Sequence, residues 1–329
     1  MRRGRGFSYR TATGAPVDAE TLERIEQLAI PPAWTDVWIC PWPNGHIQAL
    51  GTDAAGRRQY LYHQDWRAHR DREKFDRVLT LGRSIADLRA KVTADLEAGG
   101  MGKERVLAAT VRLLDIGCFR IGGEAYAAEH DTFGLATMRK EHVKVRGPQM
   151  VFSYPAKGSK WVQIAVREPA VLPVVRALVR RRGGGDDLFA YKEKGRWVDV
   201  RSDDVNAYIK EAAGGDYSAK DFRTWSATVL AAARLAEISP PPASVTARRR
   251  AVARVVRDVA DHLGNTPAVC RSSYIDPRVL DRFDGGATIR PALAAVHDPA
   301  ALDDESLRNS VDRAVVALID GGDGERRAA

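Results

Sequence analysis

The sequence predicts an α+β protein in which a small β-rich N-terminal domain precedes a larger, mainly α-helical domain with a three-stranded antiparallel β-sheet. Short alternating segments fill the first 66 residues, apolar residues at helical spacing dominate after residue 77, and three more alternating segments lie between residues 142 and 166. The chain has 329 residues, of which 44% are hydrophobic, so a real core is expected. We place the domains at 1–70 and 71–297, followed by an acidic C-terminal tail at 298–329.

The N-terminal domain is predicted to hold one short helix at 18–28 and three strands, at 36–41, 46–52 and 58–63. Turn signals at 43–45 and 53–56 separate the strands. Alternation in the last strand places Tyr60 and Tyr62 on one face, next to two arginines. Tyrosines there could donate hydrogen bonds to phosphates, or they could simply pack on a helix.

Residues 66–77 are dense in charge, and we interpret them as a solvated helical connection between the domains. The alternative is that they open the next helix, whose apolar stripe is Ile85, Leu88, Val92 and Leu96. A second helix at 105–119 ends at Arg120. An arginine there is costly to bury unless an anion receives it; the alternative is a salt bridge to Glu124 or Asp115.

Three strands are predicted near 143–145, 150–154 and 161–166, and Lys157 lies at the tip of the second turn. A lysine on a hairpin tip can reach away from the body, although such a residue often serves only solubility. Helices at 169–181 and 202–213 follow, joined by a loop and a short extended piece. The segment 220–225 then opens an alanine-rich helix and carries Arg223.

The segment 248–274 combines a helix, a corner and a tyrosine. Its apolar stripe is Val252, Val255, Val256, Val259 and Leu263, and Gly264 is expected to end the helix. Thr266 and Pro267 have the residue types of an N-cap and a first helical position. Asn265 is left beside free N–H groups in a corner that suits an anion, and Tyr274 is close enough in sequence to attack one. The alternative is a helical hairpin with a half-buried tyrosine.

The net charge indicates which class of partner the protein binds, and the cysteine content indicates its redox compartment. The net charge is +8, and the tail carries eight acidic residues and four arginines, so residues 1–297 carry +12. This surplus favours a polyanion partner, although a solvated basic surface would also account for it. The three cysteines have no metal-ligand or disulfide spacing, which fits a reducing cytoplasm. We see no signal peptide and no membrane span. The chain also shows no Walker-type loop and no carboxylate cluster of metal-site pattern, so we expect no metal and no cofactor.

The order of Arg120, Lys157, Arg223, Asn265 and Tyr274, within the texts FRIG, KDFRT and GNTP…Y and near GLATM, resembles the catalytic domain of type IB DNA topoisomerases. The poxvirus-like bacterial branch is most similar, and the resemblance runs from about residue 59 to residue 274. It implies the fold shared with tyrosine recombinases and ATP-independent relaxation of supercoiled duplex DNA through a 3′-phosphotyrosyl intermediate. It also implies a monomer that closes as a clamp around double-stranded DNA in the cytoplasm, associated with the nucleoid.

The resemblance assigns a role to each residue. Tyr274 attacks phosphorus, Arg120 and Arg223 hold the non-bridging oxygens, and Lys157 protonates the leaving 5′ oxygen. Asn265 donates a further hydrogen bond, although the family usually carries histidine there; His262 lies three residues earlier, within the helix. We expect DNA contacts from a further set, which comprises Gln59, Tyr60, Tyr62, Tyr126 and Lys220.

Two alternatives remain at this point. A tyrosine recombinase shares the catalytic domain, but recombinases generally show HxxR where this chain has Lys220-x-x-Arg223, and they carry a helical N-terminal clamp. A non-catalytic DNA-binding protein would explain the charge but not the presence of all five residues. The KxxR text and the β-rich first 66 residues favour the topoisomerase interpretation.

Overall fold

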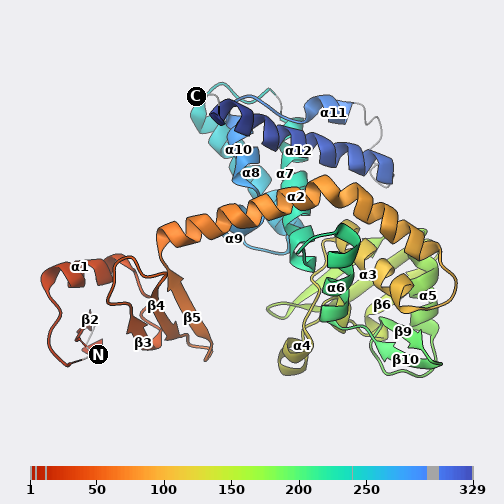
Figure 1. Cartoon of the computed structure of the whole chain (residues 1–329), viewed down its shortest axis with the longest axis horizontal. Coiled ribbons are helices and arrows are strands. Elements are labelled where there is room, and N and C mark those ends of the chain that lie inside the picture. Colours follow the sequence, from red (N-terminus) through yellow and green to blue (C-terminus); the bar gives the residue numbers. More distant parts are fainter. Residues whose placement is uncertain (1, 4–5, 12, 239, 295–303, 328–329) are drawn as a thin grey trace. The chain divides into compact units, whose positions relative to one another are not determined.

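The computed structural model describes residues 2–3, 6–11, 13–238, 240–294 and 304–327. The chain divides into two compact units, Met1–Lys74 and Phe75–Ala329, whose elements are labelled in Figure 1. The division falls inside α2 (Gln64–Glu97), a helix of 34 residues. Within the described ranges, no helix has both the length and the apolar character needed to cross a membrane.

The first unit contains a three-stranded antiparallel sheet in the order β3-β4-β5. Only one α-helix lies wholly within the described residues of this unit. Asp18 caps it by accepting a hydrogen bond from the Thr21 N–H. Its elements are β1 (Arg2–Arg3), β2 (Gly6–Phe7), α1 (Ala19–Gln27), β3 (Thr35–Ile39), β4 (Ile47–Thr52) and β5 (Arg58–Tyr62). The predicted helix and all three predicted strands are therefore confirmed to within two residues.

Helix α2 takes in the whole charged segment 66–77, so the alternative reading of that segment is confirmed: it opens the next helix. The predicted stripe of Ile85, Leu88, Val92 and Leu96 is buried. Helix α3 (Lys103–Gly117) follows and ends at Cys118, whose φ of 51° lies in the left-handed region. A non-glycine residue in that region is strained, and here it turns the chain toward Arg120.

The second sheet has the order β6-β7-β8 and is antiparallel throughout, as predicted. Its strands are β6 (Val143–Arg146), β7 (Gln149–Ala156) and β8 (Lys160–Val166). Alternation along β7 buries Met150, Phe152, Tyr154 and Ala156 in the core and turns the intervening residues outward. Lys157 lies in the exposed turn between β7 and β8.

Short elements surround this sheet: α4 (Glu124–His130), η1 (Leu135–Thr137), η2 (Lys140–His142), α5 (Leu172–Arg180), β9 (Ala190–Glu193), β10 (Arg196–Asp199) and α6 (Ser202–Ala213). The predicted extended piece is in fact the hairpin β9–β10. Its turn residues Lys194 and Gly195 both have positive φ, which is the geometry of a tight hairpin turn.

A second helical layer carries the C-terminal half, with α7 (Ala219–Glu237), α8 (Val245–Leu263), α9 (Pro267–Ser273), α10 (Pro277–Asp284), α11 (Arg290–Ala294) and α12 (Glu305–Arg327). The whole predicted stripe of α8, from Val252 to Leu263, is buried. Gly264 ends α8 with a φ of 64°, and the Thr266 side chain caps α9 by accepting a hydrogen bond from the Val269 N–H.

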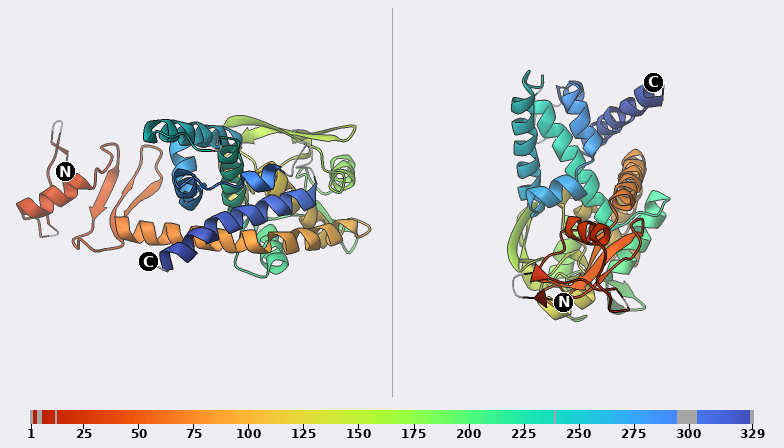
Figure 2. Two further views of the ribbon diagram at one scale, coloured as in Figure 1. Left: turned by 90° about the horizontal axis from the view of Figure 1, so that it is seen from above. Right: turned by 90° about the vertical axis from the view of Figure 1, so that its left-hand side faces the viewer.

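The acidic segment predicted as a C-terminal tail contains helix α12, which packs against α7 and α10 (Figures 1 and 2). Residues 298–303 and 328–329 of that segment lie outside the described residues. Val311, Val315 and Ile319 are buried, and they repeat every four residues. The net charge of the whole segment does not reveal this short stripe. The burial of the stripe shows that α12 is part of the folded second unit.

Asp312 on α12 binds to two other helices in the core. Its carboxylate accepts hydrogen bonds from Arg89 Nη1 on α2, at 2.5 Å, and from Trp225 Nε1 on α7, at 2.8 Å. Arg89 also donates two hydrogen bonds to Asp115 on α3, at 2.8 and 2.9 Å. All three charged side chains are about 5% exposed, so each depends on the others for its partners.

Asp312→Ala should lower the free energy of unfolding by about 3 kcal/mol or more, because it leaves a buried arginine with a single carboxylate and an indole N–H with no acceptor. Chemical denaturation followed by circular dichroism measures this. Asp320→Ala is the matched control, since the Arg83–Asp320 pair joins the same two helices, α2 and α12, but is 48% and 40% exposed, and its loss should cost about 1 kcal/mol or less. Equal losses in the two variants would contradict a structural role for the Arg89–Asp312 pair.

Candidate active site

Arg120 follows α3 and reaches the corner after α8. Its main chain is fixed because the Arg120 carbonyl accepts a hydrogen bond from the Leu135 N–H at 2.9 Å. Its Nη2 donates to the Gly264 carbonyl at 3.2 Å and to Asn265 Oδ1 at 3.0 Å. The side chain therefore joins residues that are 145 positions apart in the sequence.

Arg223 lies in the first half of α7 and is only 5% exposed. Its Nη1 donates to the Cys118 carbonyl, and its Nη2 donates to the Leu263 carbonyl at 2.8 Å. Its Nε is buried and has no hydrogen-bond partner. Among the residues that the structure describes, no carboxylate lies within ion-pair distance of either Arg120 or Arg223, so neither of the two acids weighed above, Asp115 and Glu124, pairs with Arg120.

The corner after α8 holds Asn265 in one orientation. Its N–H donates to the Ala260 carbonyl at 2.9 Å, and its side-chain oxygen accepts from Arg120. The side-chain Nδ2 is buried without a partner, so the amide retains a free donor. A buried donor without a partner costs free energy, which a bound acceptor would recover.

Tyr274 is the residue directly after α9, and its backbone is held on both sides. Its N–H donates to the Cys270 carbonyl at 3.0 Å, and its carbonyl accepts from Thr228 Oγ1 at 3.3 Å. The side chain is half-buried, and the guanidinium carbon of Arg223 lies 5.7 Å from the centre of its ring. The half-buried tyrosine of the alternative reading is thus present, but it lies against one of the two arginines.

A cavity of about 360 Å³ lies between β8 and the end of α8 and is lined by Arg120, Arg223, Tyr154 and His262, among others. Burial, reinforced by the like charge of Arg223, lowers the pKa of Arg120. Burial raises the pKa of Tyr154 to about 12, so this phenol stays protonated. Burial lowers the pKa of His262, and the positive charge of Arg223 lowers it further. His262 therefore adds a neutral imidazole at pH 7.

Lys157 is not brought into this group. It lies in the exposed turn between β7 and β8, where Gly158 and Ser159 have φ values of 78° and 56°. Within the described residues it makes no hydrogen bond and no ion pair, and it does not line the cavity. Four of the five predicted residues therefore lie together, and the fifth is on the same hairpin as the cavity wall β8.

Four of the five residues predicted to contact DNA are exposed, and the fifth, Gln59, is half-buried. Tyr60 and Tyr62 are 45% and 42% exposed, and their rings stack with centres 6.1 Å apart, which confirms that they share a face. Tyr62 also stacks on Trp66 of α2 at 4.6 Å, so packing on a helix is confirmed for this residue. Gln59 Nε2 donates to Asp53 at 2.9 Å. In the second unit, Tyr126 is 41% exposed on α4, and Lys220 is exposed on α7.

Sequence reasoning missed Tyr154 and Cys118. The alternation near 150–154 predicted a strand there, and nothing local shows that the Tyr154 side chain lines the cavity. Cys118 contributes its carbonyl, a group that every residue has, so no side-chain pattern could have identified it. No group of three or more His, Cys, Asp or Glu that could hold a metal ion occurs among the residues that the structure describes.

The arrangement has the chemistry of an anion site with an oxygen nucleophile. Two guanidinium groups and one free amide donor converge without acidic partners, and guanidinium donors match the oxygens of a phosphate. A phenol lies against one of the guanidinium groups. This set can bind a phosphodiester, stabilise negative charge on its oxygens and present a hydroxyl to its phosphorus.

Comparisons with known proteins agree with this chemistry. The model of the eukaryotic DNA topoisomerase I catalytic core matches residues 63–284, and that of the bacterial DNA topoisomerase IB N-terminal domain matches residues 6–53. The chain is 31% identical over 274 residues to DNA topoisomerase 1B of Acanthamoeba polyphaga mimivirus, covering 81% of each chain. It is 22% identical over 279 residues to DNA topoisomerase 1B of Vaccinia virus, covering 80% of this chain and 82% of the relative. DNA topoisomerase 1 of Daucus carota is 31% identical over 160 residues, which are 48% of this chain and 19% of that protein.

Inorganic phosphate should raise the melting temperature of the protein, because it offers acceptors to donors that otherwise have none. The shift should be lost in Arg120→Gln and kept in Arg180→Gln, which removes an exposed charge elsewhere. Differential scanning fluorimetry with phosphate, and with chloride at equal ionic strength, measures it. A shift that chloride reproduces, or that Arg120→Gln retains, would place the anion elsewhere.

Proposed function

Because the chain belongs to the type IB DNA topoisomerases, which are type I topoisomerase isomerases, we propose that it relaxes supercoiled duplex DNA by breaking and rejoining one strand through a phosphotyrosyl intermediate. The observation that carries the mechanism is the convergence of donors without acidic partners beside a phenol. Arg120, Arg223 and Asn265 supply those donors, and Tyr274 supplies the phenol.

In the cleavage step, Tyr274 Oη forms a bond to phosphorus while the bond from phosphorus to the 5′ oxygen breaks. The phenolic proton passes to solvent, and the departing 5′ oxygen gains a proton from an acid. The DNA strand is left as a 3′-phosphotyrosyl ester and a free 5′ hydroxyl. Reversal of the same step rejoins the strand, and because the ester conserves the energy of the broken bond, no ATP is required.

The two arginines act on the charge that develops in this step. Arg223 is held by two carbonyls and Arg120 by one carbonyl and one amide, so both guanidinium groups are oriented before substrate arrives. Preorganised donors of this kind are typically worth roughly 10²–10³ in rate each. Lysine would keep the charge but lose the planar, paired donors, so it is not an equivalent replacement.

Asn265 adds a neutral donor. Its oxygen is occupied by Arg120, which fixes the amide so that Nδ2 is the end left free for a phosphate oxygen. An amide does not titrate, so this contact is independent of pH. A histidine in the corner could also donate one hydrogen bond while neutral, which explains how either residue can serve in the family.

Lys157 is proposed as the general acid for the 5′ oxygen. It is exposed, sits in a turn with two residues of positive φ and has no partner among the described residues. Its ammonium group is therefore free to reach a bound strand, and the cavity wall β8 leads directly from this turn.

Duplex DNA is the proposed partner, gripped by a monomer whose two units close as a clamp. The +12 charge of residues 1–297 and the paired exposed rings of Tyr60 and Tyr62 support this, because cations neutralise phosphates and phenols donate to them. Gln59, Tyr126 and Lys220 complete the proposed contact set. Binding of this kind weakens steeply as salt concentration rises.

Tyr274→Phe should bind duplex DNA like the wild type but relax no plasmid and form no covalent adduct, since it loses only the nucleophilic oxygen. Plasmid relaxation without ATP or magnesium, and denaturing gels of trapped complexes, test this. Thr266→Ser is a suitable control, because it keeps the cap of α9 and should stay active. An adduct that persists in Tyr274→Phe would assign the nucleophile to another residue.

Lys157→Ala should slow cleavage of an ordinary phosphodiester by roughly 10²–10⁴-fold, the usual contribution of general acid catalysis. A 5′-bridging phosphorothiolate leaves without needing a proton, so it should restore much of the lost rate. Lys160→Ala, an exposed lysine three residues away, controls for loss of charge on the hairpin. Single-turnover cleavage of both substrates measures the effect, and an absence of rescue by sulfur would exclude Lys157 as the acid.

A further inference from the structure

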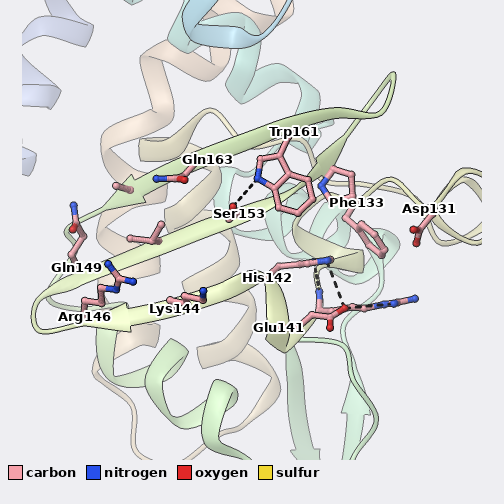
Figure 3. Close-up of a pocket in the computed structure, with 14 residues that line it drawn as sticks. Asp131, Phe133, Glu141, His142, Lys144, Arg146, Gln149, Ser153, Trp161 and Gln163 are labelled. Atoms are coloured by element: carbon pink, nitrogen blue, oxygen red, sulfur yellow. Dashed lines mark hydrogen bonds and ion pairs between the residues drawn. The ribbon is translucent and has the colours of Figure 1, made fainter.

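The outward face of the β6-β7-β8 sheet carries a trough of about 720 Å³, shown in Figure 3. It is lined by the residues of β7 and β8 that point away from the core, together with residues of β6 and of the segment before it. Figure 3 shows the labelled side chains of Lys144, Arg146, Gln149, Ser153 and Trp161 standing on this one face. None of the catalytic roles proposed above uses it.

Trp161 is the main apolar group of the trough. It is 68% exposed, yet its single polar atom is satisfied, because Nε1 donates to Ser153 Oγ at 2.9 Å (Figure 3). This bond holds the indole in one orientation across the sheet. An exposed, oriented aromatic ring on an antiparallel sheet offers a flat surface on which a planar ligand can stack.

Positive charge without a partner lies further along the same face. Lys144 and Arg146 on the edge strand β6 are exposed and form no ion pair among the described residues. The acidic residues of the trough are at its other end, where Glu141 lies 3.7 Å from Arg139. In the strand register, Gln149, whose side chain is neutral, lies opposite Arg146. The trough therefore combines an aromatic platform with an uncompensated cationic end.

We propose that this face binds an unpaired DNA strand, with a base stacked on Trp161 and phosphates near Lys144 and Arg146. In the strand register, Trp161 is opposite Pro155 and Lys144 is opposite Val151. These rows are four residues apart on β7, or roughly 13 Å, so a base and phosphates of one short strand can reach both. Stacking on aromatic side chains beside cations is how sheet surfaces bind single strands without sequence preference.

A duplex fits this face less well, because its bases are stacked on each other and offer no free surface to an indole. The trough shares Gln163 and Ala165 with the cavity beside Arg120 and Arg223. A strand on the sheet can therefore continue over the edge of β8 toward that cavity. The proposal goes beyond strand cleavage, since binding here requires neither Tyr274 nor any reaction.

The test is fluorescence anisotropy with the full chain and three probes: a labelled oligothymidylate, an abasic oligomer of equal length and a blunt duplex. Trp161→Ala should weaken binding of oligothymidylate roughly five-fold or more and leave the abasic oligomer unchanged, because only a base can stack. Lys144→Gln with Arg146→Gln should weaken both single-stranded probes and reduce the slope of log K against log salt by about 1.4.

Arg180→Gln with Arg182→Gln is the control, because it removes two exposed charges from another surface. It should change neither the ratio of the affinities for oligothymidylate and the abasic oligomer nor the slope of log K against log salt. Relaxation of plasmid by Trp161→Ala should stay near the wild-type level, so failure of this proposal is separable from failure of the cleavage mechanism. Equal effects of Trp161→Ala on thymidylate and abasic probes would overturn the stacking site. A larger loss on the duplex than on the single strand would assign the face to duplex DNA and overturn the proposal as well.

Discussion

Two arginines are held close together, with no carboxylate of the described residues paired to either, and the ends of two helices make this possible. Arg223 donates to the carbonyls of Cys118 and Leu263, at the C-terminal ends of α3 and α8, and Arg120 donates to that of Gly264. The last carbonyls of a helix have no partner within it and carry partial negative charge, which favours a nearby cation. The helix ends thus compensate the two charges while leaving both groups able to bind a phosphate, which a carboxylate partner would prevent.

This arrangement depends on α3, α7 and α8 meeting at a fixed point. The buried cluster of Arg89, Asp115 and Asp312 connects α2, α3 and α12, and the bond from Trp225 to Asp312 adds α7. Asp115 lies three residues before Cys118, and Trp225 lies two residues after Arg223. Burial would raise the pKa of Asp115, but the charge of Arg89, with weaker contributions from Arg308 and Arg112, brings it below its usual value. Burial raises the pKa of Asp312 above its usual value, so within the cluster the lowered pKa belongs to Asp115, the carboxyl that accepts two hydrogen bonds from Arg89.

Local pattern predicted the elements well where one period ran unbroken. The stripe of α8, the alternation of β7 and the cap and proline that start α9 are all statements about neighbours in the chain, and the structure has them. Periodicity could not show that Asp312 meets Arg89, because 223 residues separate them. It also could not place Lys157 relative to the arginines, since a turn fixes where a side chain starts and not where it reaches. The order of the five residues indicated the site only through resemblance.

The position of α12 in the sequence has a consequence for synthesis. A chain is made from its N-terminus, so every group assigned to the reaction, up to Tyr274, is present before α12 exists. Until Asp312 arrives, Arg89 lacks its second carboxylate and the Trp225 N–H has no acceptor, so α7 lacks this link to α2 and α12. A fragment that stops short of α12 carries all the reactive groups without the contact that aligns them.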